Sequence, residues 1–296
     1  MATGSDVSAQ SEAPSAAPVP VASLPGVFAI GDPGRAAFAT PDGPPTPAVS
    51  PPDVAASSAA LPGMLIRAAS VRGIQHKAQH SVRQDAFALG HAGGGSHAIA
   101  VVCDGVGSLD RSDHAATLVS QRLTQLAMSG APWPVAFETA NAELGQVAAE
   151  CEARQWGGMA TTAMALSVTR RSGVWMGEAA WVGDSPLWHL SEDGAWAPVT
   201  EVPDGDGQGF HSSTVRAMPT ADGTCSWCSF RIHGGALFAM SDGVSNPLAW
   251  SAEVRDTLAS WWACPPEPLA FAAQVGFARK SHIDDRTAVG IWPDGE

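Results

Sequence analysis

The chain has 296 residues, of which 45% are apolar and 15% charged, enough apolar sequence to bury one large core or two small ones. Its formal charge of −13 at pH 7 argues against the clustered Lys and Arg that phosphate-backbone contacts require, so we expect no nucleic-acid partner. No apolar run reaches the roughly 20 residues of a membrane span, and the N-terminus lacks a signal-peptide pattern, so we expect a cytoplasmic protein without a membrane partner.

The N-terminal part differs in composition from the rest. Residues 1–62 hold 12 of the 23 prolines, are rich in Ala and Ser, and show no sustained period of 2 or 3.6 residues. Such a segment cannot offset its ordering entropy by burial, so we predict a disordered tail. Folded structure is expected to begin near Met64, with a single domain over residues 63–296.

The first half of this domain alternates strand and helix patterns. Strands are predicted over 64–73, 85–90 and 97–105 because apolar residues dominate short runs that end in turn signals. A helix is predicted from about Asp113 to Met128. A second helix follows Pro134, where apolar residues again recur at helical spacing.

The second half is rich in strands. Two more helices are predicted near 251–262 and 266–278, and between the strands the turn signals suit antiparallel hairpins. Two groups of helices around many strands indicate an α+β layered domain, not a βαβ repeat. The strands are expected over residues 160–169, 173–185, 186–196, 225–235, 235–243 and 285–292.

The five cysteines form an odd, scattered set, which fits reduced thiols better than a disulfide framework. Only Cys225 and Cys228 have motif spacing. Zinc would need a second ligand pair, which the sequence lacks, and the two cysteines sit inside an alternating run. We therefore interpret both as strand residues.

Four acidic residues share one context. Asp104, Asp184 and Asp242 close apolar strands, and Asp284 opens one. If these strands lie side by side in stacked sheets, the carboxylates meet at one rim and repel each other unless cations bind there. Oxygen ligands alone select Mg²⁺ or Mn²⁺, and Gly105 can add its carbonyl. For each residue taken singly, an ordinary Asp-Gly turn is the competing interpretation.

Six short motifs, in order, resemble the PPM family of metal-dependent protein phosphatases, which are protein phosphatase 2C-like. The similarity is greatest to the bacterial subgroup whose first motif runs Gly, His, then Gln-Asp-Ala-Phe, and it covers about residues 64–293. The motifs are QDAFAL (84–89), VVCDGVGS (101–108), GGMATTAMALSV (157–168), WVGDSPLWHL (181–190), LFAMSDGVS (237–245) and IDDRTAVGIW (283–292).

The resemblance implies a four-layer αββα sandwich with two central antiparallel sheets and a site for two Mn²⁺ or Mg²⁺ ions at one end. By position in the motifs, Asp104 would bridge both metals and the Gly105 carbonyl would hold the second. Asp242 and Asp284 would hold the first, and Asp85 would order metal-bound water.

The resemblance also implies a chemistry. Asp184 matches a residue that in many bacterial members helps to bind a third, weaker metal. A water that bridges two divalent ions would attack the phosphorus of phosphoserine or phosphothreonine in line, without a phosphoenzyme. The expected partners are a phosphorylated protein and an opposing Ser/Thr kinase, and we expect a monomer.

The sequence departs from the family pattern in two places. Gln84 stands where most members carry Glu, which predicts weaker binding of the second metal. Residues 106–108 replace the His or Met-Gly-Gly that many members have after Asp-Gly, so no histidine there can act as general acid. His76, His80 or a metal-bound water can take that role; for both histidines the alternative is a surface residue in a polar loop.

Phosphate binding in the family uses an Arg a few residues before the first Asp. Arg72 and Arg83 are both candidates, with Arg72 preferred because it follows a strand. Arg286 is a third, with a structural ion pair as its alternative role. Thr161 and Thr162 are expected to pack near the metals.

Two rivals to a phosphatase stay open. One is a degenerate family member that binds metal or phosphoprotein without turnover, which Gln84 and the missing histidine favour. The other is a metal-stabilised structural domain.

Overall fold

The computed structural model describes residues 30–32, 53–201 and 215–294. Its elements, in chain order, are β1 (Val54–Leu61), β2 (Met64–Val71), α1 (Ile74–Ala78), β3 (Ala86–Ala92), the 3₁₀ turn η2 (Gly93–Gly95), β4 (His97–Cys103), α2 (Ser112–Met128), α3 (Trp133–Ala153), β5 (Ala163–Arg171), β6 (Val174–Val182), β7 (Leu187–Leu190), β8 (Trp196–Pro198), β9 (Ser226–Arg231), β10 (Ala236–Met240), α4 (Asp242–Trp250), α5 (Ala252–Trp262), α6 (Pro268–Val275) and β11 (Arg286–Pro293).

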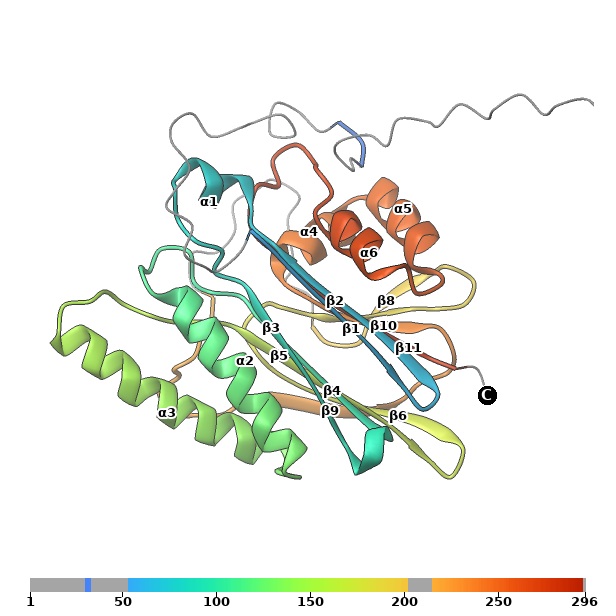
Figure 1. The fold of residues 1–296 in the computed structure, drawn as a ribbon, viewed down its shortest axis with the longest axis horizontal. Helices are drawn as coiled ribbons and strands as arrows, with labels where there is room; N and C mark the ends of the chain where they lie inside the picture. Colours follow the sequence, from blue (N-terminus) through green and yellow to red (C-terminus); the bar gives the residue numbers. More distant parts are fainter. Residues whose placement is uncertain (1–29, 33–52, 202–214, 295–296) are drawn as a thin grey trace, which may run out of the picture.

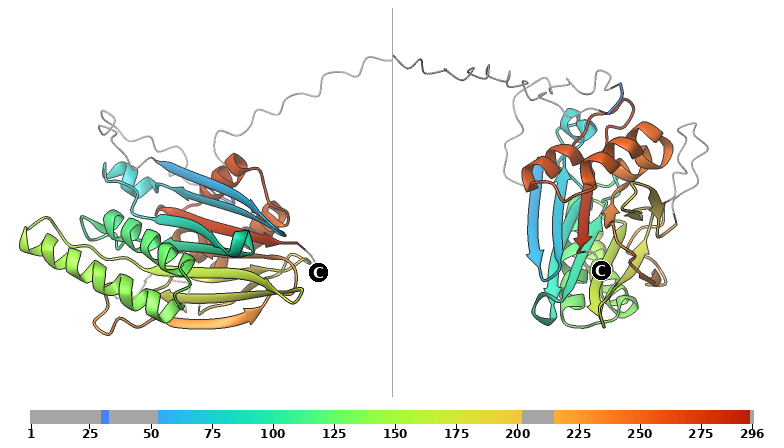
Figure 2. Two further views of the ribbon diagram at one scale, coloured as in Figure 1. Left: turned by 60° about the horizontal axis from the view of Figure 1, so that its bottom comes forward. Right: turned by 90° about the vertical axis from the view of Figure 1, so that its right-hand side faces the viewer.

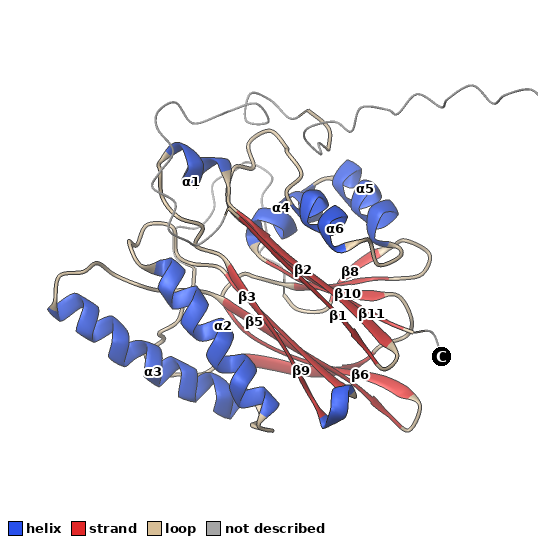
Figure 3. Cartoon of the chain, viewed as in Figure 1, coloured by secondary structure: helices blue, strands red, loops and turns tan. Residues whose placement is uncertain are grey.

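Two antiparallel sheets form the centre of the molecule. The first has the strand order β1-β2-β11-β10-β7-β8, and the second has the order β3-β4-β5-β6-β9. Helices α4, α5 and α6 lie outside the first sheet, and α2 and α3 outside the second (Figures 1 and 2). Figure 3 shows the same separation of helical and strand layers. The fold is therefore the α+β, four-layer αββα sandwich that was predicted.

Three buried clusters hold the four layers together. One fills the space between the sheets and includes Ile66, Val102 and Leu166. A second lies under α2 and α3, where Val119 and Leu123 point inward one turn apart. The third lies under the C-terminal helices and is rich in aromatic rings, with Phe238 stacked on Trp262 at 5.0 Å between centroids. Burial of these apolar faces supplies the main stabilising free energy of the fold.

Strand β1 lies inside the segment predicted to be disordered, so the prediction that structure begins near Met64 is wrong. β1 pairs with β2 along its whole length, from Val54 opposite Val71 to Leu61 opposite Met64. Its sequence, VAASSAAL, is mostly small residues with weak strand propensity. Hydrogen bonds to β2, together with Ala59 and Leu61 packed against the cluster between the sheets, hold this edge strand. Its small residues are the reason that its composition resembled the tail.

Ile30 also lies inside the predicted tail, and it is only 2% exposed. Its side chain belongs to the cluster under the C-terminal helices. The Ile30 N–H donates to the Ala278 carbonyl at 3.1 Å, and the Lys280 N–H donates to the Asp32 carbonyl at 3.0 Å. Residues 30–32 are thus attached to the chain just before Asp284. The rest of the predicted tail, residues 1–29 and 33–52, lies outside the described residues.

We expect Ile30→Asp to lower Tm by about 5 °C, because burying an unpaired carboxylate releases residues 30–32 from the core. Ile30→Val is the matched control, since it removes only one methylene and should cost less than half as much. Thermal unfolding followed by circular dichroism measures both. Equal Tm values for Ile30→Asp and wild type would show that this contact contributes nothing to stability.

No helix within the described part of the chain is long and apolar enough to cross a membrane. The Cys225 and Cys228 thiols are free. Cys225 packs on the cluster under α2 and α3, whereas Cys228 packs between the sheets. Their side chains therefore face opposite sides of the second sheet, so they form neither a metal pair nor a disulfide, as the strand interpretation predicted.

Candidate metal centre

The register of the second sheet brings three of the acidic residues to one edge. Asp85 immediately precedes β3 and Asp104 immediately follows β4, and these strands pair at Ala86 and Cys103. Asp184 follows β6, whose last residue pairs with the first residue of β5. Because antiparallel neighbours run in opposite directions, starts and ends of successive strands meet at the same edge.

The first sheet contributes two more acidic residues to this edge. Asp242 follows β10 and Asp284 precedes β11, where Met240 pairs with Ala288. The carboxylate of Asp104 interacts electrostatically with Asp85, Asp242, Asp284 and Asp184. Both sheets therefore present their acidic ends to one place. The predicted convergence of these side chains is confirmed.

The five carboxylates differ in their exposure to solvent. Asp85 is buried, Asp104, Asp184 and Asp242 are partly exposed, and Asp284 is exposed. A ligand can thus approach past Asp284 while the inner carboxylates keep fixed positions.

Crowding destabilises the charged forms of these acids. Loss of hydration, followed by repulsion from Asp284 and Asp184, raises the pKa of Asp242 to about 7, and a hydrogen bond with Asp104 offsets part of that rise. Loss of hydration and repulsion from Asp85 raise the pKa of Asp104 well above its ordinary value. The pKa of Asp85 is raised in the same way, with Asp285 as its main repelling neighbour. Bound cations would relieve this repulsion.

Hydroxyl groups fix the two inner acids. The Thr161 hydroxyl donates to the Asp104 carbonyl at 2.9 Å, and the Thr162 hydroxyl accepts from the Asp104 N–H at 3.3 Å. The Ser241 hydroxyl donates to the Asp85 carboxylate at 2.7 Å. Thr161 and Thr162 are both buried, so the expectation that they pack near the site is confirmed.

The glycines after Asp104 and Asp242 allow close packing of the chain at the acidic edge. A Cβ on Gly105 would lie 2.8 Å from the Gln84 carbonyl oxygen, and one on Gly243 would lie 1.9 Å from the Asp285 carbonyl oxygen. Neither glycine has a positive φ. Absence of a side chain lets two acid-bearing segments approach each other here.

Asp285 organises the site, and the sequence analysis missed it. Its carboxylate accepts the N–H groups of Gly73 and Gln84, each at 2.6 Å, and that of Asp85 at 3.4 Å. His76 Nδ1 lies 2.9 Å from Asp285 Oδ1. This one side chain therefore ties the loop before β3 to the start of β11. The only available signal was a second acid next to Asp284.

The donor atoms of His76, Asp284 and Asp285 lie within 4.8 Å of one another, a spacing that could hold an ion. However, both oxygens of Asp285 already accept backbone N–H groups. We therefore regard this triad as a structural ion pair beside the acidic cluster, not as a metal site.

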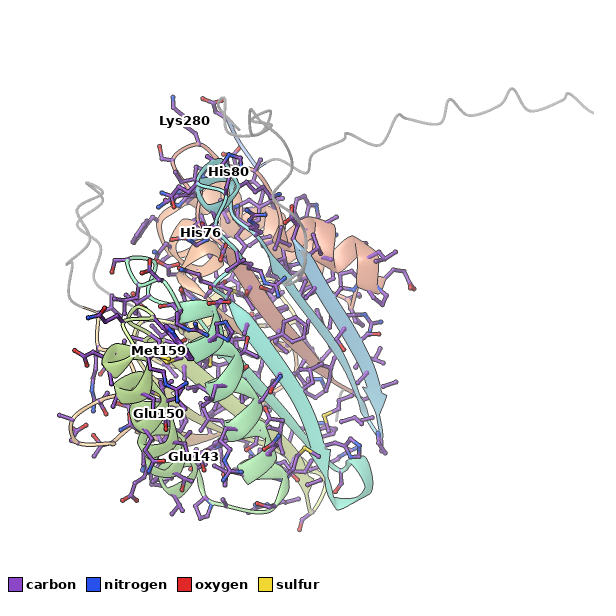
Figure 4. All side chains as sticks on the ribbon, turned by 60° about the vertical axis from the view of Figure 1, so that its left-hand side comes forward. His76, His80, Glu143, Glu150, Met159 and Lys280 are labelled. Atoms are coloured by element: carbon purple, nitrogen blue, oxygen red, sulfur yellow. The ribbon has the colours of Figure 1, made fainter. Side chains whose placement is uncertain are left out.

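The two candidate histidines differ. His76 is buried, and its contact with Asp285 raises its pKa above the ordinary value despite burial. The alternative of a surface residue is thus wrong for His76, whereas His80 is exposed, as that alternative expected. His76 lies in α1 and His80 follows its end by two residues, and both are labelled in Figure 4.

The three candidate arginines are engaged inside the protein. Arg72 forms an ion pair with Asp53 at 2.9 Å and donates to the His76 carbonyl. Arg83 is buried and donates to the Asp85 carbonyl at 3.1 Å. Arg286 donates to the His282 carbonyl at 2.5 Å and lies 4.9 Å from the Phe277 ring centroid. The expected pairing of Arg286 with a carboxylate is replaced by these contacts, although Asp284 still acts on its charge.

The donor set fits divalent cations. Five carboxylates supply hard oxygen ligands, as Mg²⁺ and Mn²⁺ prefer. The buried Gln84 Oε1 has no hydrogen-bond partner among the described residues, while its Nε2 donates to the Leu109 carbonyl at 3.2 Å. This neutral oxygen stands where the family usually has a carboxylate, so the residues present fit a cation site with one charge fewer.

The raised pKa values predict how the metal-free protein responds to pH. Between about pH 3.9, where unfolded aspartate titrates, and about pH 7, where Asp242 titrates in the fold, the native state binds more protons. Stability should therefore fall as pH rises. His76 acts in the same direction, because its raised pKa means that the stability of its ion pair is lost as pH rises.

In EDTA we expect Tm to be about 5 °C higher at pH 6 than at pH 8, with a smaller difference in Mn²⁺. Asp242→Asn should flatten the dependence in EDTA. A Tm that increases with pH in EDTA would contradict this account.

One further phosphatase signature is present by spacing alone. Cys225 and Arg231 are separated by five residues, as in the nucleophile loop of Cys-dependent phosphatases. Residues 226–231 form strand β9, which is extended and cannot wrap a phosphate. Burial raises the pKa of Cys225 to about 11, so its thiol is not an active nucleophile.

The structure is a layered sandwich with an acidic edge. The chain belongs to the protein phosphatase 2C family, because residues 72–273, more than half of the chain, match the family model. The resemblance predicted from the motifs is thus confirmed. Asp85, Asp104, Asp184 and Asp242 lie inside the match. Among curated proteins, none is similar enough in sequence to count as a relative.

Solved structures of low identity share the fold. The S. agalactiae serine/threonine phosphatase aligns with a TM-score of 0.59 and 16% identity, over 78% of this chain and 100% of that one. Serine/threonine phosphatase Stp1 from Staphylococcus aureus aligns with a TM-score of 0.55 and 14% identity, over 78% and 95%. A bacterial serine phosphatase aligns with a TM-score of 0.54 and 14% identity, over 78% of this chain and 98% of that one.

Proposed function

We propose that this protein is a Mn²⁺- or Mg²⁺-dependent phosphatase that hydrolyses phosphoserine and phosphothreonine in proteins. One observation carries the proposal: five carboxylates from both sheets meet at one edge, where loss of hydration and then mutual repulsion raise the pKa values of Asp85, Asp104, Asp242 and Asp284. A fold stabilised only by packing gains nothing from such a cluster, whereas a cation site needs it. A Ser/Thr kinase would supply the substrate.

The roles follow the arrangement of the residues. Asp104, with the Gly105 carbonyl, would be shared between two ions, and Asp242 and Asp284 would complete the site of the first. Bound divalent ions would activate water and neutralise the phosphate oxygens during in-line attack. Asp184 interacts electrostatically with both Asp104 and Asp242 and would assist a third ion.

The protein's own groups position this chemistry. The Ser241 hydroxyl donates to one oxygen of the Asp85 carboxylate and so fixes the orientation of this buried side chain. The two threonine contacts hold the Asp104 backbone against the segment just before β5. No arginine among Arg72, Arg83 and Arg286 is available to clamp the phosphate without giving up contacts inside the protein.

Hydrolysis of p-nitrophenyl phosphate and of a phosphoserine peptide, each with Mn²⁺, Mg²⁺ or EDTA, tests the proposal. Turnover should require a divalent ion and should be lost in Asp242→Asn. No turnover with any divalent ion, together with metal binding by calorimetry, would instead favour the degenerate member, which the uncharged Gln84 keeps open as a second candidate.

A further inference from the structure

A small aromatic and cationic patch lies beside the acidic edge. Trp156, in the loop after α3, is 53% exposed. The guanidinium carbon of Arg154 lies 4.7 Å from the centroid of its ring, and that of Arg111 lies 5.7 Å from it. The three residues, called the Trp156 patch below, hold two positive charges over one indole surface.

Neither guanidinium pairs with an acid within the part of the chain that the structure describes. No ion pair or side-chain hydrogen bond of Arg111 or Arg154 is formed within the described residues, and the Arg111 Nε atom is buried without a partner there. Asp110 contacts the same loop, since a Cβ on Gly157 would lie 2.8 Å from its Cβ, but it pairs with neither arginine in the described structure. Arg72, Arg83 and Arg286, by contrast, all have acceptors inside the protein. The patch is therefore free to bind an anion.

Two neighbouring loop segments, residues 105–111 and 156–161, connect the patch to the acidic edge. Gly105 forms a bridge with Thr161, and from there the Val106 N–H donates to the Ala160 carbonyl at 3.0 Å. Further out, the Arg111 N–H donates to the Gly158 carbonyl at 3.1 Å. Met159, between these contacts, is buried and labelled in Figure 4. Trp156 is five residues from Thr161, so it lies at most about 18 Å away along the chain.

We propose that the Trp156 patch binds acidic residues of the phosphoprotein substrate, within about five positions of the phosphoserine. The inference rests on the proposed function in one respect: the phosphoserine of the substrate is bound at the acidic edge. A protein with a net charge of −13 repels acidic segments over most of its surface. Two unpaired cations beside the acidic edge would reverse that locally and select substrates whose flanking residues are Asp or Glu.

Binding of two peptides tests the patch without relying on turnover. Both carry a non-hydrolysable phosphonate analogue of phosphoserine; one has Asp and Glu at flanking positions three to five and the other has Gln there. Fluorescence anisotropy in Mn²⁺ at low salt should show about tenfold tighter binding of the acidic peptide by wild type. Arg111→Gln/Arg154→Gln should reduce that preference below about threefold, and Trp156→Ala should also lower it.

Arg170→Gln/Arg171→Gln is the matched control. It removes the same charge at the far end of β5, about 27 Å from the acidic edge, where Arg170 likewise lies near a tryptophan ring, that of Trp175. The preference should persist in this variant. Equal binding of the two peptides by wild type, no binding of either, or an unchanged preference in Arg111→Gln/Arg154→Gln would overturn the patch. If the acidic peptide is preferred but neither peptide is hydrolysed in its phosphoserine form, the proposal for the Trp156 patch holds and the proposed phosphatase function is wrong.

Discussion

Asp104→Asn should reduce turnover of p-nitrophenyl phosphate by about a thousandfold or more, yet it should make the metal-free protein more stable than wild type. Loss of activity is expected because Asp104 is the carboxylate that interacts with all four others, so its charge is central to any cation site. The gain in stability follows from the same fact. Asn keeps the shape of the side chain but removes the charge that its neighbours repel.

In EDTA at pH 8 we expect the Tm of Asp104→Asn to exceed that of wild type by about 5 °C. In Mn²⁺ the order should reverse, because binding stabilises only the form that holds the metal. Asp256→Asn, an exposed change on α5 away from the cluster, should alter neither Tm nor turnover. A wild-type protein that is more stable than Asp104→Asn in EDTA would show that the cluster is held by internal contacts and needs no cation.

The sequence was sufficient to predict the acidic edge, because it depends on where strands begin and end. Short apolar runs ending at Asp104 and Asp242 indicate strand ends, and antiparallel pairing then brings them to one side. The same reasoning missed α4, because Asp242 and Gly243, its first two residues, were interpreted as the end of a strand and a turn. Pro247 inside this short helix also weakens the helical signal of its sequence.

The loop before β3 shows what sequence patterns could not reveal. His76, Arg83 and Gln84 are polar residues in a polar loop whose sequence pattern does not indicate burial, yet all three are buried. They are buried because Asp285, about 200 residues later, accepts the backbone N–H groups of this loop. Satisfaction of polar groups over such a distance leaves no local periodicity.

Asp285→Ala should lower the free energy of unfolding by about 3–5 kcal/mol, the cost typical of breaking a buried ion pair. The substitution leaves the N–H groups of Gly73 and Gln84 without their acceptor and leaves His76 without its partner. Asp285→Asn should cost less, because an amide oxygen still accepts one of these donors. Asp53→Ala is the control, since it removes an exposed partner of Arg72 and should cost about 1 kcal/mol or less.

Urea unfolding measures these differences, and calorimetry with Mn²⁺ connects them to the site. Asp285 also accepts from the Asp85 N–H and repels its carboxylate, so its removal should both loosen Asp85 and lower its pKa. Metal affinity of Asp285→Asn should then fall about tenfold, as for loss of a group that orients a ligand. If Asp285→Asn instead binds Mn²⁺ as tightly as wild type while losing stability, Asp285 maintains the fold without positioning Asp85, and the loop reaches its active geometry by packing alone.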